Sequence, residues 1–229
     1  MHAKNLKNKD DLVILMHGIG HTGLNMTGLS WALQREGYKT LAITYPSTRL
    51  NIESNALWLK NNKLNPPLLH KYARIHFVCH SMGGLIAHTY IQTMNGLLPK
   101  EKMGRVVFLG TTNKGSPIAD LLKNVFLYKL IFGPAGQQLT IYARIKNPVD
   151  ADYELGVIAG TRGWLYPIAC LFFKEKSTSH DGRVSVKSTY VDGMRDHICL
   201  PVTHSFMMWK PAIWKQVIAF LKTGSFIHE

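Results

Sequence analysis

The 229-residue chain carries 27 Lys and Arg against 14 Asp and Glu, which gives a formal net charge of +13. Hydrophobic residues make up 46% of the chain, a fraction that is typical of globular proteins and excludes intrinsic disorder. The longest strictly apolar run, Trp164–Phe173, is far shorter than the roughly 20 residues of a membrane-spanning helix. We therefore expect one globular domain over residues 1–229 and no transmembrane segment.

Short apolar runs alternate with longer amphipathic stretches, and this alternation predicts parallel strands joined by helices. The expected strands cover residues 12–16, 40–44, 74–79, 106–109, 155–159 and 198–202. The expected helices cover residues 22–36, 51–61, 82–95, 117–131 and 208–222. Several strands are apolar throughout, as parallel strands are when helices cover both faces of a sheet. The sequence thus predicts an α/β fold with a mainly parallel central sheet. Ligands bind at the carboxyl ends of the strands in such sheets.

The excess of basic residues suggests affinity for anionic surfaces, either nucleic acid or acidic lipid headgroups. However, the basic residues are scattered, and the nearest thing to a cluster (KNLKNK, residues 4–9) is typical of a short solvated arm. We favour a solvated basic surface that makes at most transient contact with an anionic membrane, and we expect no nucleic-acid partner. The oligomeric state stays open.

The cysteines and the start of the chain bear on the compartment. The apolar stretch at residues 12–16 is too short for a secretory signal, and no small-residue cleavage site follows it, so we expect a cytoplasmic protein. Cys79, Cys170 and Cys199 are an odd number without close pairing, which favours reduced thiols. No CxxC or HExxH spacing occurs, so we expect no metal and no cofactor.

The first strand ends in HGIGHTG, residues 17–23, which allows two interpretations. Residues 18–23 match the GxGxxG fingerprint of dinucleotide-binding proteins, between a strand and a helix. That fingerprint also needs a carboxylate at the end of the second strand, where the nearest one is Glu53; Arg49 could instead bind the 2′-phosphate of NADP. Alternatively, the loop supplies backbone N–H groups to an oxyanion.

The third strand runs into Cys79-His80-Ser81-Met82-Gly83, which matches GxSxG except for Cys79 in the first position. A serine on a sharp strand-to-helix turn exposes its Oγ at the edge of the sheet, and small neighbours let strand and helix approach closely. The N–H of Met82, at the start of the helix, then faces a developing oxyanion, whose negative charge the helix dipole favours. The alternative is a serine that merely caps the helix.

A nucleophilic serine in this architecture needs a histidine base further along the chain. The histidines downstream of Ser81 are His88, His180, His197, His204 and His228. We predict His204, because it follows the last expected strand at its carboxyl end. His197 lies at the opposite end of that strand and is expected to be structural or a surface residue.

The triad also needs an acid between the serine and the base. Asp181 lies in an Asp-Gly turn upstream of His204, and although Asp-Gly is a common surface turn, this requirement favours it. The rival carboxylates are Asp150, Asp152, Asp192 and Asp196.

At this point the chain resembles the α/β-hydrolases, in particular small bacterial lipase- or esterase-like members. The motifs that carry the resemblance are HGIG at 17, YPSTR at 45, CHSMGG at 79, LGTTNKGS at 109, DGRVSVKST at 181 and LPVTHSFMM at 200. The resemblance implies that Ser81 is the nucleophile, Asp181 the acid and His204 the base. It also implies that the backbone N–H of Ile19 is a second oxyanion donor beside Met82, with His17, Gly18 and His80 supporting the loop. Cys79 departs from the usual glycine; being small it should fit, although crowding there could narrow the acyl site.

Two apolar stretches, Ala119–Phe132 and Gly163–Phe173, are expected over the carboxyl side of the sheet. Both are either ordinary packing segments or parts of an apolar acyl pocket with a partial lid, the candidate segments being about 117–132 and 160–175. The predicted function is hydrolysis of carboxylic or lipid esters through an acyl-enzyme. An NADP-dependent oxidoreductase and a non-catalytic protein that binds lipid or an acidic partner are the alternatives. The sequence does not separate ester hydrolysis from thioesterase, amidase or acyl-transfer chemistry.

Overall fold

The computed structural model describes residues 10–93, 100–163 and 179–228. Its six strands are β1 (Asp11–Met16), β2 (Lys39–Ile43), β3 (Arg74–His80), β4 (Met103–Leu109), β5 (Leu155–Gly160) and β6 (Asp196–Leu200). They form one sheet in the order β2-β1-β3-β4-β5-β6, and every neighbouring pair is parallel. The predicted fold class is therefore confirmed.

The α-helices are α1 (Thr27–Arg35), α2 (Ile52–Asn62), α3 (Pro66–Leu69), α4 (Met82–Thr93), α5 (Pro117–Leu122), α6 (Phe126–Gln137), α7 (Ile141–Lys146), α9 (Val186–Thr189) and α10 (Pro211–Thr223). The described residues also contain three short 3-10 helices: η2 (Gly23–Met26), η3 (Lys100–Lys102) and η5 (His204–Trp209). In the described part of the chain, none of these helices has the length and apolar content needed to cross a membrane.

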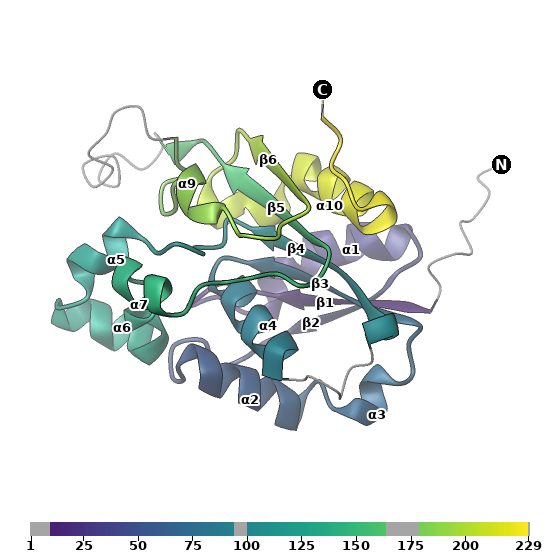
Figure 1. Ribbon diagram of the computed structural model, residues 1–229, viewed down its shortest axis with the longest axis horizontal. Coiled ribbons are helices and arrows are strands. Elements are labelled where there is room, and N and C mark those ends of the chain that lie inside the picture. The colour runs from purple at the N-terminus through teal and green to yellow at the C-terminus, as the bar shows by residue number, and fades with distance from the viewer. Residues whose placement is uncertain (1–9, 94–99, 164–178, 229) are drawn as a thin grey trace.

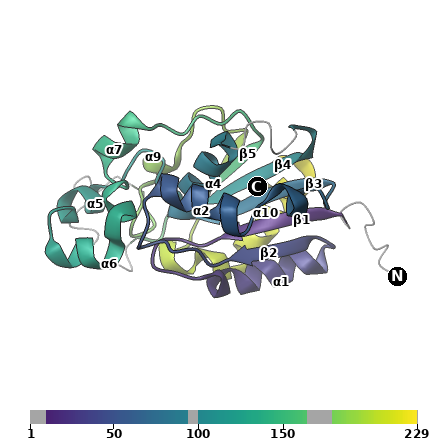
Figure 2. The same ribbon diagram turned by 90° about the horizontal axis from the view of Figure 1, so that it is seen from below.

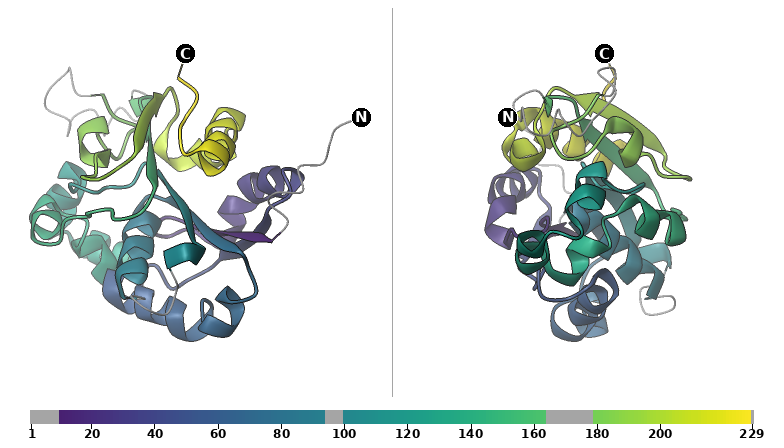
Figure 3. Two further views of the ribbon diagram at one scale, coloured as in Figure 1. Left: turned by 45° about the vertical axis from the view of Figure 1, so that its right-hand side comes forward. Right: turned by 90° about the vertical axis from the view of Figure 1, so that its left-hand side faces the viewer.

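Helices cover both faces of the sheet, and successive strand residues feed two separate cores (Figure 1 and Figure 3). Leu12, Ile14 and Met16 of β1 pack with α2 and α4, whereas Val13 and Leu15 pack with α1 and α10. This division follows from the period of two along a strand. It explains why β1 is buried and apolar throughout.

Several element boundaries differ from the expected ones by a few residues, and two of the differences have a clear cause. The sixth strand ends at Leu200 instead of residue 202, because Pro201 has no N–H to donate to the sheet. The helix expected over 117–131 is two helices, since the backbone at Val125 is extended. The second of them bends again at Gly133, which has a φ of 57° and precedes Pro134. A Cβ at Gly133 would lie 1.7 Å from the carbonyl oxygen of Thr48, so only glycine permits this contact.

The loops that follow the strands gather at one edge of the sheet, and Figure 2 shows α5, α6 and α7 at this end of the molecule. Helix α4 begins directly after β3 and crosses close to the end of β1. Gly83 permits this approach, because a Cβ there would lie 2.6 Å from the carbonyl oxygen of His17.

We expect Gly83→Ala to lower the free energy of unfolding by about 1–3 kcal/mol, because the added methyl must push the backbone of β1 and α4 apart. Urea unfolding measures this difference. The control is Thr93→Ala at the exposed end of the same helix, which should change stability by about 0.5 kcal/mol or less. Equal stability of the Gly83→Ala and wild-type proteins would refute the close approach.

Candidate active site

Ser81 lies on the turn between β3 and α4, in a conformation that non-glycine residues rarely adopt. Its φ is 54°, and among the described residues it is the only non-glycine with a positive φ. The turn is held by hydrogen bonds from the N–H of Ser81 to the carbonyl of Leu109 (2.9 Å) and from the N–H of Gly84 to the carbonyl of Ser81 (3.0 Å). Such strain persists only where the surrounding structure imposes it, and it is common at functional sites. The sharp strand-to-helix turn predicted at Ser81 is thus present.

A continuous chain of hydrogen bonds joins Ser81 to a histidine and an acid. His204, at the start of η5, has its Nε2 3.0 Å from Ser81 Oγ and its Nδ1 2.7 Å from Asp181 Oδ2. All three side chains are buried: Ser81 is 8% exposed, His204 3% and Asp181 1%. The backbone N–H of His204 also donates to the carbonyl of Asp181, at 3.0 Å. The structure brings together the three residues that the strand ends predicted.

Asp181 is oriented by its own turn. Its Oδ1 accepts from the backbone N–H groups of Arg183 (2.9 Å) and Val184 (2.8 Å), which leaves Oδ2 to accept from His204. The Nδ1 of His204 therefore carries the proton, and Nε2 is the acceptor that faces the Ser81 hydroxyl. This is the tautomer that a general base needs.

None of the rival acids reaches His204. The backbones of Asp150 and Asp192 form an isolated β-bridge with each other, and the carboxylate of Asp152 accepts a hydrogen bond from the side chain of Gln92. Asp196 begins β6 and accepts from the N–H of Phe226, at the opposite edge of the sheet.

The rival histidines also lie elsewhere. His197 is in β6, with its Nε2 3.0 Å from the hydroxyl of Thr189, and His88 contacts the hydroxyl of Tyr153. His228 contacts Asp196, and His180 lies next to Asp181 but does not replace His204 in the hydrogen-bonded chain. His197 is half-buried, in keeping with the structural role expected for it.

The loop after β1 presents backbone N–H groups beside Ser81. Within the part of the chain that the structure describes, no group accepts from the N–H of Ile19 or of Met82. The loop that carries Ile19 is held by the segment after β2. Tyr45 donates its hydroxyl to the carbonyl of His17, and the two rings stack with centroids 4.1 Å apart. The hydroxyl of Ser47 accepts from the N–H of Gly20 at 3.1 Å.

The same loop is a poor cradle for a dinucleotide. The N–H of Gly20 donates to Ser47, that of His21 to the carbonyl of Gly18, that of Thr22 to Asn25 and that of Gly23 to Thr44. A pyrophosphate needs such donors unengaged. In the described residues these four already have acceptors within the protein, so the loop argues against the NADP interpretation.

A mainly apolar cavity of about 310 Å³ opens beside Ser81 and His204. Its walls include Ile118, Ala119 and Leu122 of α5 and Tyr128 and Phe132 of α6. One of the two predicted apolar stretches therefore lines a pocket next to the serine. The other, Gly163–Phe173, lies outside the described residues except for Gly163.

Cys79 does not narrow this pocket. Its side chain is fully buried in the core on the α2 and α4 side of the sheet and is not among the pocket walls. Burial raises the pKa of its thiol well above the usual value, which makes it unreactive. Neither Cys79 nor Cys199 forms a disulfide, and Cys170 lies outside the described residues.

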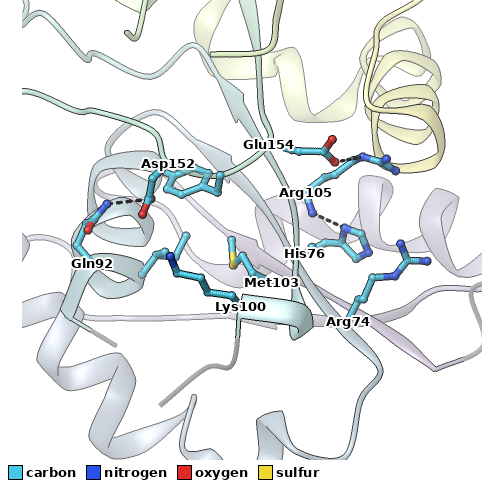
Figure 4. Close-up of a pocket in the computed structure, with 11 residues that line it drawn as sticks. Arg74, His76, Gln92, Lys100, Met103, Arg105, Asp152 and Glu154 are labelled. Carbon is cyan, nitrogen blue, oxygen red and sulfur yellow. Dashed lines mark hydrogen bonds and ion pairs between the residues drawn. The ribbon is translucent and has the colours of Figure 1, made fainter. Parts of the chain in front are cut away.

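A second cavity of similar size, about 320 Å³, lies at the amino ends of β3, β4 and β5 (Figure 4). Most of its charged side chains are paired within the protein. Arg105 binds Glu154 with 2.6 Å between Nε and Oε2, and Asp152 accepts from Gln92 at 3.2 Å. No predicted site residue reaches this cavity, so it is not the candidate site.

No protein-family model matches the sequence. Two large tegument protein deneddylases match part of it: that of human herpesvirus 6A is 28% identical over 135 residues, 49% of this chain and 6% of the viral protein, and that of human herpesvirus 6B is 27% identical over the same share. The chain spans only about 6% of the length of these curated relatives.

Solved structures match the whole fold. The mature lipase BlEst2 of Bacillus licheniformis superposes with a TM-score of 0.74 and 15% identity, over 96% of this chain and 93% of the lipase. The chain has the α/β-hydrolase fold. A metagenomic carboxyl esterase (TM-score 0.68, 17% identity, 86% of this chain and 65% of that one) is also similar. So is phospholipase PlaB of Legionella pneumophila (TM-score 0.68, 16% identity, 93% and 58%).

Within this α/β-hydrolase fold, sequence reasoning missed the residues that hold the loops. Tyr45 and Ser47 were noted only as part of a motif, yet they fix the loop that carries Ile19. Asn113 donates to the carbonyl of Thr189 at 2.8 Å, and Ser116 to that of Arg183 at 3.2 Å, so the loop after β4 holds the segment of Asp181. The hydroxyl and amide side chains in the loops after β2 and β4 were the feature of the sequence that could have pointed to these residues.

Burial keeps two histidines near Ser81, His17 and His80, neutral at neutral pH. It lowers the pKa of His17 from 6.5 to about 4. It also lowers the pKa of His80 well below its usual value, with a further contribution from His204 and His21. His80 lies against His204: the Nε2 of His80 is 3.0 Å from the carbonyl oxygen of His204, and the ring centroids are 4.8 Å apart.

We expect the free energy of unfolding to fall as the pH is lowered from about 6.5 to about 4. In this window the unfolded chain binds protons at His17 that the folded chain does not, so the lower pH favours unfolding. For His17 alone, the shift from 6.5 to about 4 corresponds to about 3 kcal/mol. His80 adds a loss of the same sign. Urea unfolding at pH 7.5 and pH 5 measures the effect; equal stability at both values would contradict it.

Proposed function

We propose that the protein is a serine ester hydrolase that forms an acyl-enzyme on Ser81. The observation that carries the proposal is the hydrogen-bonded chain from Ser81 Oγ through His204 to Asp181, with distances of 3.0 and 2.7 Å. The lipase and esterase neighbours of the same fold support this class of reaction. No second function is favoured by a specific observation.

The proposed reaction begins when the Ser81 Oγ attacks the ester carbonyl and its proton passes to Nε2 of His204. Asp181 holds the imidazole in the required tautomer and stabilises the imidazolium that forms. The C–O bond of the ester then breaks, and His204 gives the proton to the departing alkoxide oxygen. Water next attacks the acyl-enzyme with His204 again as base, which releases the carboxylic acid and restores Ser81.

Negative charge develops on the carbonyl oxygen in each tetrahedral intermediate. The N–H groups of Ile19 and Met82 are the proposed donors to this oxygen, because neither has an acceptor among the described residues and both lie next to Ser81 in the chain or the fold. The N-terminus of α4 adds a favourable dipole, since Met82 is its first residue. Tyr45 and Ser47 are positioning residues, which act through the loop of Ile19.

The proposed substrate carries an apolar acyl group. The cavity beside Ser81 has mainly aliphatic and aromatic walls, and at about 310 Å³ it lies at the small end of the range for ligand sites. Its size favours a carboxylic or lipid ester with a single acyl chain in the pocket over a bulky polymer.

The test is hydrolysis of p-nitrophenyl esters with acyl chains from two to sixteen carbons. We expect turnover that rises from acetate to chains of medium length as the pocket fills. A matched thioester and anilide separate ester hydrolysis from thioesterase and amidase activity. If the folded protein hydrolyses none of these, the proposal is wrong and a binding role on the same fold takes its place.

A further inference from the structure

Helices α6 and α7 turn several large apolar side chains toward solvent. Phe126, Leu127, Leu130, Ile131, Tyr142 and Ile145 are each at least half exposed, and Phe126 reaches 77%. We call these six residues the apolar face. Helix α5 contacts both α6 and α7, and Figures 1 and 2 show all three gathered at one end of the molecule. Exposed apolar clusters of this kind mark interaction surfaces.

The apolar face lies directly behind the pocket wall. Tyr128 and Phe132 of α6 line the cavity beside Ser81, whereas Leu127, Leu130 and Ile131 of the same helix point to solvent. A ligand that lies on the apolar face is therefore within one helix diameter of the proposed acyl pocket.

The rest of the fold anchors these helices in place. Gln138, at the end of α6, accepts from the N–H of Ile52 at 2.7 Å and donates to Glu53 at 2.7 Å, which fixes the helix to the start of α2. The N–H of Ile141 donates to Asp120 at 3.0 Å, which joins α7 to α5. These hydrogen bonds hold α6 and α7 in the positions in which the six apolar side chains point to solvent.

The charged residues of the segment that carries the apolar face are mostly basic. Residues 110–149 contain five basic residues and one acidic residue, Asp120. Asp120 is engaged with Ile141 and with Lys123, whose Nζ lies 3.5 Å away. Lys129 and Lys146 are exposed, and Lys146 stacks over the ring of Tyr142 at 4.5 Å. A second copy of the chain on this surface would bring like charges together, whereas an anionic surface complements them.

We propose that the apolar face, with Lys129 and Lys146, docks on an anionic lipid surface and so places the mouth of the acyl pocket at the lipid. The apolar side chains enter the boundary between headgroups and acyl chains, and the lysines contact the anionic headgroups. This inference names the physical state of the substrate and rests on the proposed function.

The test is co-sedimentation of the Ser81→Ala protein with phosphatidylcholine vesicles, with and without 30% phosphatidylglycerol. Ser81→Ala is used because binding is then read without turnover. We expect binding to the anionic vesicles that is about tenfold weaker or more in Leu127→Asn/Leu130→Asn, and similarly weaker in Lys129→Glu/Lys146→Glu. When Ser81 is kept, both double variants should hydrolyse a soluble short-chain ester as well as the wild type does, since none of the four substituted residues lines the pocket.

The matched controls are Leu57→Asn, at an apolar residue of α2 with 57% exposure, and Lys63→Glu, at an exposed lysine directly after that helix. Both should bind vesicles like the parent protein. Absence of vesicle binding, or binding that all four variants weaken equally, overturns the docking surface. So does a dimer in solution that Leu127→Asn/Leu130→Asn dissociates, because the occupant would then be a second copy. If the wild-type protein binds vesicles but hydrolyses no ester, only the proposed function is overturned.

Discussion

Replacing Ser81 by alanine should lower kcat/KM for p-nitrophenyl butyrate by about 10⁴- to 10⁶-fold, because the attacking oxygen is lost and only binding and the oxyanion donors remain. The variant should keep its fold. Alanine adopts the φ of 54° no less easily than serine, and the hydrogen bonds that hold the turn come from the backbone. Initial rates measure the loss, and the melting temperature checks the fold.

Ser225→Ala is the matched control, since Ser225 is exposed and does not line the cavity beside Ser81. It should retain wild-type activity. A Ser81→Ala protein that hydrolyses the ester within tenfold of the wild type would exclude Ser81 as the nucleophile.

Asp181→Asn should lower kcat by about 10⁴-fold with little change in KM, because an amide nitrogen facing Nδ1 of His204 favours the wrong tautomer of the imidazole. The turn should persist, since the amide oxygen still accepts from the N–H groups of Arg183 and Val184. Steady-state kinetics with p-nitrophenyl butyrate separate kcat from KM.

The control for this variant is Asp152→Asn, at a rival acid that lines the cavity at the amino ends of the strands. It should leave kcat unchanged. Similar losses in the two variants, or a loss below tenfold in Asp181→Asn, would remove Asp181 from the proposed mechanism.

Much of the fold was predictable because the strands are short, apolar and separated by amphipathic segments. All six expected strands are present, and their parallel pairing follows from the helices between them. One error is local, because Pro201 ends the sixth strand, and another lies where a tertiary contact overrides the local pattern. The bend at Gly133 depends on its close approach to the segment of Thr48, which is distant in sequence.

The candidate site was predictable where its reactive side chains lie at the carboxyl ends of the strands. Ser81 was identified from the residues around it, and His204 and Asp181 from their order and position. The residues that hold the loop of Ile19 were not predictable, because Tyr45 and Ser47 form hydrogen bonds with backbone groups 27 or 28 residues earlier in the chain. Such hydrogen bonds depend on how the loops meet, which no local pattern encodes.

The central claim is that Ser81 is an activated nucleophile, and labelling by a fluorophosphonate probe tests it most directly. The probe phosphonylates a serine only where a base accepts its proton, and it needs no knowledge of the natural substrate. We predict rapid labelling of the wild type and none above background in Ser81→Ala or His204→Ala. A folded wild type that is not labelled, or a His204→Ala protein labelled as fast as the wild type, would contradict the account.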